Sequence, residues 1–161
     1  MLISKELNAA INEEIGLELF AANQYTNTAA YFDSLALKKL AKMFYKQASE
    51  EREHADKFVH YLAETGGTLQ IPAVKPPQAA FKSVEEAVKL ALKWEFEVTR
   101  RINGLMTLAI EQKDYIAQDF LRWFVTEQLE EVSTMDNLLK VVQQAGDRSL
   151  IMIEAYLSHQ G

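Results

Sequence analysis

The sequence predicts an all-α fold, an antiparallel bundle of four long helices. Three observations indicate it. Apolar residues recur about every 3.5 positions through four segments of similar length, which is the spacing that a helix presents to the core of a bundle. Helix caps and stops separate these segments. Each apolar stripe is also interrupted near its middle by glutamate, histidine or glutamine, so all four predicted helices share one unusual feature.

The first predicted helix begins after Ser4, whose hydroxyl can cap it, and ends in the region 32–34. Its core-facing stripe is Leu7, Ile11, Ile15, Glu18, Ala22, Tyr25, Ala29 and Phe32. Glu18 is the only charged member. Tyr25 lies two turns further along the same face, and it is interpreted either as a packed core tyrosine or as a redox or hydrogen-bonding residue.

The second predicted helix follows a short link and stops at Gly66-Gly67. Its stripe is Leu37, Leu40, Phe44, Ala48, Glu51, His54, Phe58 and Leu62. Glu51 and His54 are spaced i and i+3, so they lie on one face of the helix. A lone Glu-x-x-His is usually a surface feature, but matching interruptions in the other three helices favour metal binding.

Ser83 and Glu86 form a capping box that begins the third predicted helix, and Asp114 can cap the fourth, which Gly146 ends. The third stripe is Val84, Val88, Ala91, Glu95, Val98, Ile102, Leu105 and Ala109. The fourth is Ala117, Leu121, Phe124, Gln128, Glu131, Met135, Leu138 and Val142. The links within each pair of helices are short, so helices one and two, and helices three and four, are predicted to be antiparallel neighbours.

One long crossover is predicted between the second and third helices, over residues 67–82. Its prolines exclude a continuous helix, yet it carries apolar residues and few charges. A helix of about 28 residues is roughly 42 Å long, and about 16 extended residues span roughly 50 Å. The crossover can therefore run along the bundle and leave the second and third helices parallel.

We expect a single domain over residues 1–161, with the bundle at about 4–145 and a short fifth helix at about 147–158. The fifth helix is apolar nearly all round, which predicts an oligomer contact. A length of 161 residues with 48% hydrophobic residues suits one core. The net charge of −6 disfavours nucleic acid as a partner. No stretch has the pattern of a signal peptide or membrane span, so a cytoplasmic protein is expected.

The polar interruptions predict a metal centre inside the bundle. A carboxylate on a core-facing position is costly to desolvate unless a positive charge meets it there. Glu18, Glu51, Glu95 and Glu131 supply four negative charges, which two divalent cations would balance. The chain has no cysteine, so oxygen and imidazole ligands remain. Such ligands suit iron or manganese, and zinc could also bind.

Six features of the sequence resemble bacterial non-haem ferritins over essentially the whole chain. They are Glu18, Tyr25, the run 50–54, Glu95, Trp123 and the run 127–131. The resemblance implies the ferritin-like form of the predicted bundle. It also implies one metal among Glu18, Glu51 and His54 and another among Glu51, Glu95 and Glu131, with Glu51 bridging.

The same resemblance implies the reaction and the assembly. Fe(II) would be oxidised by dioxygen or peroxide at this ferroxidase centre, and ferric mineral would be stored in a hollow homo-oligomeric shell, of 24 subunits in that family. Gln128 would position oxygen or water. Glu50, Glu127 and Glu130 resemble a third iron site that shares Glu131, although a solvated acidic face explains these three residues equally well.

Haem is not expected. Bacterioferritins carry a second Glu-x-x-His on the fourth helix, where this chain has Gln128-x-x-Glu131, and Arg52 stands where their haem-ligating methionine is expected. Two other functions are alternatives. One is a di-iron peroxidase of rubrerythrin-like type without mineral storage, although the cysteine-rich module that usually accompanies it has no counterpart here. The other is a helical interaction module whose buried acids are structural.

Overall fold

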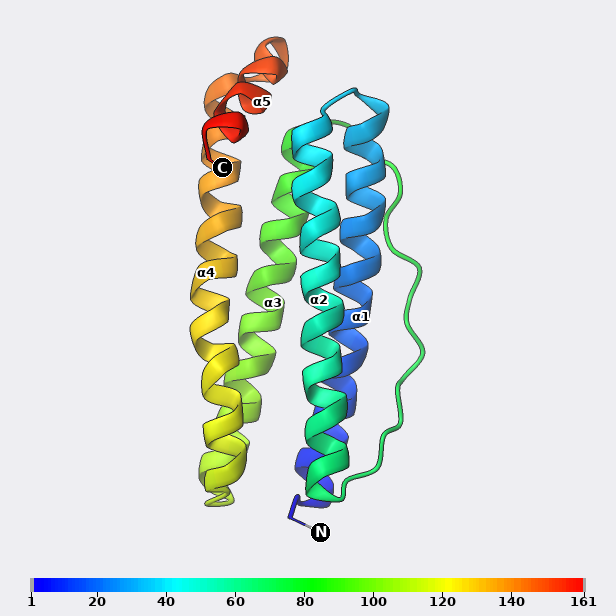
Figure 1. The fold of residues 1–161 in the computed structure, drawn as a ribbon, viewed down its shortest axis with the longest axis vertical. Coiled ribbons are helices and arrows are strands. Elements are labelled where there is room, and N and C mark those ends of the chain that lie inside the picture. The colour runs from blue at the N-terminus through cyan, green and yellow to red at the C-terminus, as the bar shows by residue number, and fades with distance from the viewer. Residues whose placement is uncertain (1, 161) are drawn as a thin grey trace.

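The computed structural model describes residues 2–160 and contains four long helices with a short fifth helix across one end (Figure 1). In chain order the helices are α1 (Lys5–Ser34), α2 (Lys38–Thr65), α3 (Val84–Glu111), α4 (Tyr115–Ala145) and α5 (Leu150–His159). Within the described residues there is no strand. The predicted all-α fold is confirmed, as is the order of two helical hairpins joined by one crossover.

Three of the long helices begin at the capping residues that the sequence predicted. Side-chain oxygens of Ser4, Ser83 and Asp114 accept hydrogen bonds from the backbone amides three residues further on, at 3.0, 3.1 and 2.9 Å. These bonds satisfy amide groups that have no partner inside the helix. Gly66 ends α2 in the left-handed conformation, with φ 73°, which a residue without Cβ adopts readily.

The start of α2 is capped from the other end of the chain. Leu37 precedes the helix and offers no capping side chain. Glu154 on α5 instead accepts hydrogen bonds from the backbone amides of Lys39 and Leu40, at 2.9 and 3.0 Å. A carboxylate is favourable there because it meets the positive end of the helix dipole. The short last helix is thereby tied to the bundle.

The fifth helix is slightly shorter than predicted, because a 3₁₀ turn, Asp147–Ser149, occupies its expected first residues. Ile153 is fully buried, whereas Ile151 and Met152 are 79% and 61% exposed. One face of α5 therefore remains apolar and uncovered in the single chain. Its role as an oligomer contact stays a prediction.

The crossover between α2 and α3 runs along the bundle beside α1, as an extended chain (Figure 1). Two side-chain amides of α1 hold it by pairing with its backbone. Asn12 donates to the carbonyl of Thr68 at 2.9 Å and accepts from the amide of Gln70 at 2.6 Å. Gln24 makes the same two bonds with Gln78, both at 2.9 Å. These bonds supply partners for backbone groups that no helix or sheet satisfies.

Two apolar clusters fill the interior, one on each side of the middle of the bundle. One includes Phe32 and Phe44 with the C-terminal half of α4, and the other includes Phe58 and Phe124 with the N-terminal half of α1. The polar residues of the four stripes fall between the two clusters along every helix. Among the described residues, no helix has the length and apolar content to cross a membrane.

Phe58→Ala should lower the free energy of unfolding by about 3–5 kcal/mol. The ring is fully buried and stacks on Phe124 with ring centroids 4.2 Å apart, so its removal leaves a cavity. Phe58→Leu removes less volume and should cost clearly less. Denaturant titration followed by circular dichroism measures both variants, and equal losses would contradict this packing.

Candidate metal centre

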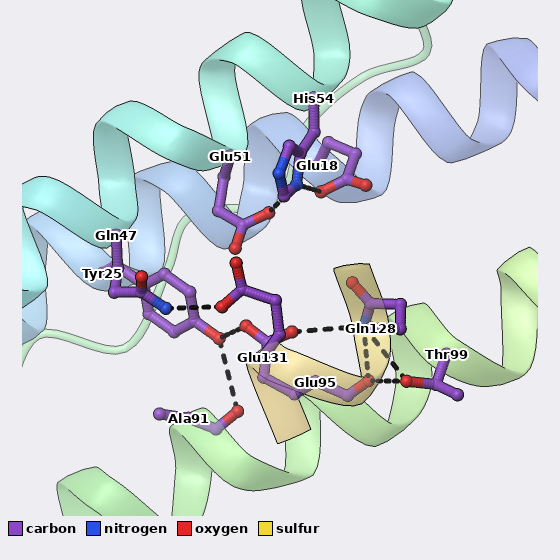
Figure 2. A network of polar contacts seen from close by, with 10 residues as sticks. All are labelled: Glu18, Tyr25, Gln47, Glu51, His54, Ala91, Glu95, Thr99, Gln128 and Glu131. Carbon is purple, nitrogen blue, oxygen red and sulfur yellow. Dashed lines mark hydrogen bonds and ion pairs between the residues drawn. The ribbon is translucent and has the colours of Figure 1, made fainter. Parts of the chain in front are cut away.

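The polar layer between the two apolar clusters brings together side chains from all four long helices. They are Glu18 from α1, Glu51 and His54 from α2, Glu95 from α3, and Gln128 and Glu131 from α4. All six are at most 4% exposed. Figure 2 shows them pointing toward one another. The meeting point follows from the sequence, because each residue lies near the middle of its helix and packed helices of similar length share that level.

Two groups of possible ligand atoms contain the same residues as the two metal positions implied by the family resemblance. One oxygen each of Glu18 and Glu51 and a nitrogen of His54 lie within 4.8 Å of one another. Oxygens of Glu51, Glu95 and Glu131 form the second such group. Glu51 belongs to both, as a bridging ligand must. This arrangement of hard oxygen donors with one imidazole can hold two divalent cations.

Several carboxylate oxygens in this layer have no hydrogen-bond partner in the described chain. These are both oxygens of Glu18 and Oε1 of Glu51. A buried polar atom without a partner destabilises the fold, and a charged one does so more strongly. Cations in the layer would satisfy these oxygens and offset their charge. The donor set therefore fits a metal centre.

The α3–α4 side of the layer is organised by hydrogen bonds (Figure 2). The hydroxyl of Tyr25 donates to Oε1 of Glu95 at 2.5 Å. The amide of Gln47 donates to Oε2 of Glu131 at 2.7 Å. The amide of Gln128 donates to the hydroxyl of Thr99 at 3.0 Å and to Oε2 of Glu95 at 3.3 Å. Each donor restricts the orientation of a possible ligand.

One ring nitrogen of His54 faces the carboxylates of Glu18 and Glu51. Its Nδ1 lies 3.0 Å from Oε2 of Glu51 and 3.8 Å from Oε2 of Glu18. The rings of Trp123 and Phe124 meet the imidazole edge to face, with centroids 5.4 and 6.0 Å away. The packing holds the imidazole plane, so in the neutral ring Nδ1 is the nitrogen placed to bind a cation.

Burial raises the pKa of every glutamate in the layer. It raises the pKa of Glu131 to about 8 and carries those of Glu18 and Glu51 well above the ordinary value. Burial also raises the pKa of Glu95, although hydrogen bonds from Tyr25 and Gln128 oppose the shift. Without cations, Glu131 therefore holds a proton near neutral pH, and burial favours the protonated form of the other three acids. A cation that binds here would have to displace such protons.

The two other groups in the layer titrate differently. Burial lowers the pKa of His54, but the hydrogen bond and charge of Glu51 outweigh it, so the net shift is upward. Burial and the charge of Glu95 raise the pKa of Tyr25 well above its ordinary value. The phenol consequently stays protonated at neutral pH and acts as a donor to Glu95.

The three residues of the possible third iron site lie at the edge of the layer. Glu127 joins His54 and Glu131 in a further group of ligand atoms within 4.8 Å. Glu50 and Glu130 belong to none of the groups found among the described residues. Glu50 lies 3.6 Å from Lys46 in an exposed ion pair, and Glu130 is exposed. The third site stays a prediction.

Gln47 also belongs to the layer, which was not predicted from the sequence. It lies one turn before Glu51, and residues at i and i+4 share a face of a helix. Its spacing therefore could have indicated the contact. Thr99 was missed as well, four residues after Glu95, and only the position of Gln128 on the neighbouring helix explains why it joins the network.

The fold and the buried ligands define a class of protein, the four-helix bundles that build a carboxylate metal centre from facing helices. The model of the ferritin-like domain family matches residues 8–145. The chain belongs to the ferritin family.

Known relatives resemble the chain over nearly its whole length. Ferritin BfrB of Mycolicibacterium smegmatis is 35% identical over 158 residues, which are 98% of this chain and 87% of that protein. A bacterial non-heme ferritin of Staphylococcus aureus is 38% identical over 148 residues, 92% of this chain and 89% of that protein. The crystal structure of an open-pore ferritin from the archaeon Archaeoglobus fulgidus superposes with a TM-score of 0.93 at 32% identity, covering 98% of this chain and 97% of that one.

The melting temperature of the metal-free protein should fall as pH rises from about 5 to about 8. The pKa of Glu131 is about 8 in the folded state against an ordinary value of 4.5, so the folded state holds the proton more tightly than the unfolded chain. The resulting stabilisation is complete at acidic pH and is lost as pH rises through the folded value. Calorimetric melting at several pH values measures this.

Added Zn(II), which undergoes no redox chemistry, should restore the melting temperature most strongly at the upper end of that range. The ligands are easiest to deprotonate there, and a cation that binds only the folded state stabilises it. A melting temperature that rises with pH would contradict the raised pKa of Glu131 as its cause. A melting temperature that does not respond to Zn(II) would contradict cation binding by these acids.

Gln47→Leu should weaken cation binding by about 10–100-fold, because it removes the donor that orients Glu131 while keeping a side chain of similar size. Titration calorimetry with Zn(II) measures the affinity. Gln143→Leu is the matched control, since it removes another glutamine–glutamate bond between helices, the exposed one to Glu85. If both variants bind like the original protein, the Gln47 bond does not orient a ligand.

Proposed function

We propose that this protein is an iron-storage ferritin. It oxidises Fe(II) with dioxygen or peroxide at a di-iron ferroxidase centre within each subunit, and it stores ferric mineral inside a hollow shell of identical subunits, 24 by family resemblance. The observation that carries the proposal is the buried layer of four carboxylates and one imidazole from four helices, with unpartnered oxygens on Glu18 and Glu51. Family membership supports it. A cytoplasmic location remains part of the proposal.

The side chains of the layer have distinct roles in this reaction. Glu18, Glu51 and His54 bind one Fe(II), while Glu51, Glu95 and Glu131 bind the other. The four carboxylates balance two divalent cations, and they stabilise the additional positive charge that develops as each iron loses an electron. Hard, negatively charged oxygen ligands favour the ferric state because it carries more positive charge than the ferrous state.

Tyr25 and Gln128 donate hydrogen bonds to the ligand Glu95. Tyr25 donates to one oxygen of Glu95, and the amide of Gln128 donates to the other oxygen at 3.3 Å. An amide at this position can also donate to an oxygen species or water beside the metals. The two residues thus orient Glu95 and keep a polar donor at the oxidation site.

The apolar face of α5 supports assembly. Ile151 and Met152 are largely exposed on the single chain although both are apolar. Their burial between subunits would be favourable, at about 25 cal/mol for each Å² of apolar surface removed from water. A shell requires contacts of this kind.

Aerobic addition of Fe(II) to the metal-free protein tests the function. Several hundred Fe(II) per assembly should produce a soluble ferric core, visible by electron microscopy, inside particles of several hundred kilodaltons by light scattering. Precipitation of ferric hydroxide at the rate seen in buffer would overturn the proposal. A dimer that consumes peroxide without forming a core would favour the di-iron peroxidase instead.

Glu51→Ala should slow initial Fe(II) oxidation by about tenfold or more, since it removes the ligand common to both metal positions. Assembly should be retained, because the contacts of α5 are untouched. Glu53→Ala is the control, as it removes an exposed carboxylate two residues away on the same helix. Stopped-flow absorbance measures the rates, and an unchanged rate for Glu51→Ala would remove this residue from the site.

A further inference from the structure

One acidic side chain outside the metal centre is buried without being used by it. Glu14 lies on α1, one turn before Glu18, and is 1% exposed. Neither of its carboxylate oxygens has a hydrogen-bond partner among residues 2–160. The nearest positive charge is Nε of Arg101 on α3, at 3.8 Å, which is too long for a hydrogen bond. An unsatisfied buried carboxylate is costly, so its presence requires an explanation.

Glu14 lines a groove between α1 and α3 that opens to solvent. The groove holds about 220 Å³ and is lined by Ala10, Glu13, Glu14, Arg100, Arg101, Gly104 and Leu105. There is open space beside Gly104, because a Cβ added there would meet no atom within 4 Å. Glu14 therefore borders the groove on one side, while Glu18, one turn along the same face of α1, belongs to the metal layer.

The proposed reaction needs an exit for protons. Four Fe(II), one dioxygen and six waters give four FeOOH and eight protons, so two protons leave for every iron stored. Protons that stayed in the buried layer would neutralise the carboxylates and release the cations they hold. A group that accepts protons beside the layer and returns them to solvent would prevent this.

We propose that Glu14 relays protons from the Glu18 end of the metal centre to the solvent of the α1–α3 groove. This inference depends on the proposed ferroxidase function. In each cycle the Glu14 carboxylate accepts a proton released by water as iron is oxidised, then loses it to water in the groove. No electron passes through Glu14, and the residue binds no iron.

The charges around Glu14 suit this role. Burial raises its pKa to about 8, Arg101 on α3 acts in the opposite direction, and Glu97 on α3 adds to the rise. The charge of Glu14 in turn contributes to the raised pKa of Glu18. Near neutral pH the carboxylate can both gain and lose a proton, which is the condition for efficient proton transfer. The positive charge of Arg101 at the same groove disfavours passage of Fe(II) instead.

Glu14→Gln tests the relay, because glutamine keeps the size of the side chain and cannot carry the proton. Fe(II) oxidation and proton release are followed together by stopped-flow absorbance with a pH indicator. In the original protein the two signals should coincide. In the variant, turnover should slow by about tenfold or more, with proton release lagging further behind, while Zn(II) affinity in calorimetry stays unchanged.

Glu13→Gln removes the same charge from the adjacent, exposed position and should leave the rate and the coincidence of the two signals unchanged. Arg101→Gln separates a relay from a structural ion pair. It removes the charge that lowers the pKa of Glu14, so the rise of the oxidation rate with pH should move to higher pH but persist. In Glu14→Gln that rise should disappear.

Gly104→Leu provides a second test that leaves Glu14 in place, since it fills the groove with an apolar side chain and should delay proton release. The relay is overturned if Glu14→Gln and Gly104→Leu both show the original rate and no lag, or if Arg101→Gln reproduces the rate and pH profile of Glu14→Gln. If the unaltered protein fails to oxidise Fe(II), the ferroxidase proposal fails instead, which is a distinguishable result.

Discussion

Four carboxylates and an imidazole occupy interior positions where each long helix would otherwise bury apolar side chains. Removing a charged group from water costs several kcal/mol even after the protein relaxes. The structure lowers this cost in two ways. Hydrogen bonds from neighbouring helices satisfy part of the layer, and the raised pKa values of its acids favour their neutral, protonated forms when no cation is bound. Folding and the proposed metal binding would therefore be linked through the same few atoms.

The two sides of the layer are built differently. On the α3–α4 side, Tyr25, Gln47 and Gln128 restrict Glu95 and Glu131. On the α1–α2 side, both oxygens of Glu18 lack partners within the described chain. The first side is thus held in place by hydrogen bonds within the protein, while in the proposed centre the second side would be satisfied by a cation. Glu14 lies on α1 one turn before Glu18, so the proposed proton exit begins on the side whose carboxylate oxygens lack partners.

The rest of the fold holds this layer in register. Apolar clusters fill the bundle above and below it, so a shift of one helix along its axis would break packing on both sides. The crossover lets α2 and α3 run parallel, and the pairs of Asn12 and Gln24 with its backbone fasten it to α1. The crossover lies close against α1 at Gly16, since a Cβ added at that glycine would lie 2.5 Å from Pro72.

Much of the fold could be predicted from the sequence. Apolar periodicity, capping residues and glycine stops are local signals, and they predicted four helices and most of their boundaries. They did not predict that Glu154 caps α2. The two hydrogen bonds involved join residues that are 115 and 114 positions apart in the sequence, and they depend on how α5 turns back. The short 3₁₀ turn before α5 was also not predicted.

The sequence by itself determined that Glu18, Glu51, His54, Glu95, Gln128 and Glu131 would share one buried level, because a periodic stripe defines which residues face the core and where along each helix they lie. Only the tertiary structure decided which oxygens obtain partners and that Glu14 is buried while Glu13 is exposed. The physical reason is that periodicity orients a helix about its own axis, whereas contacts at the flank of a stripe depend on the distance and rotation of the neighbouring helix.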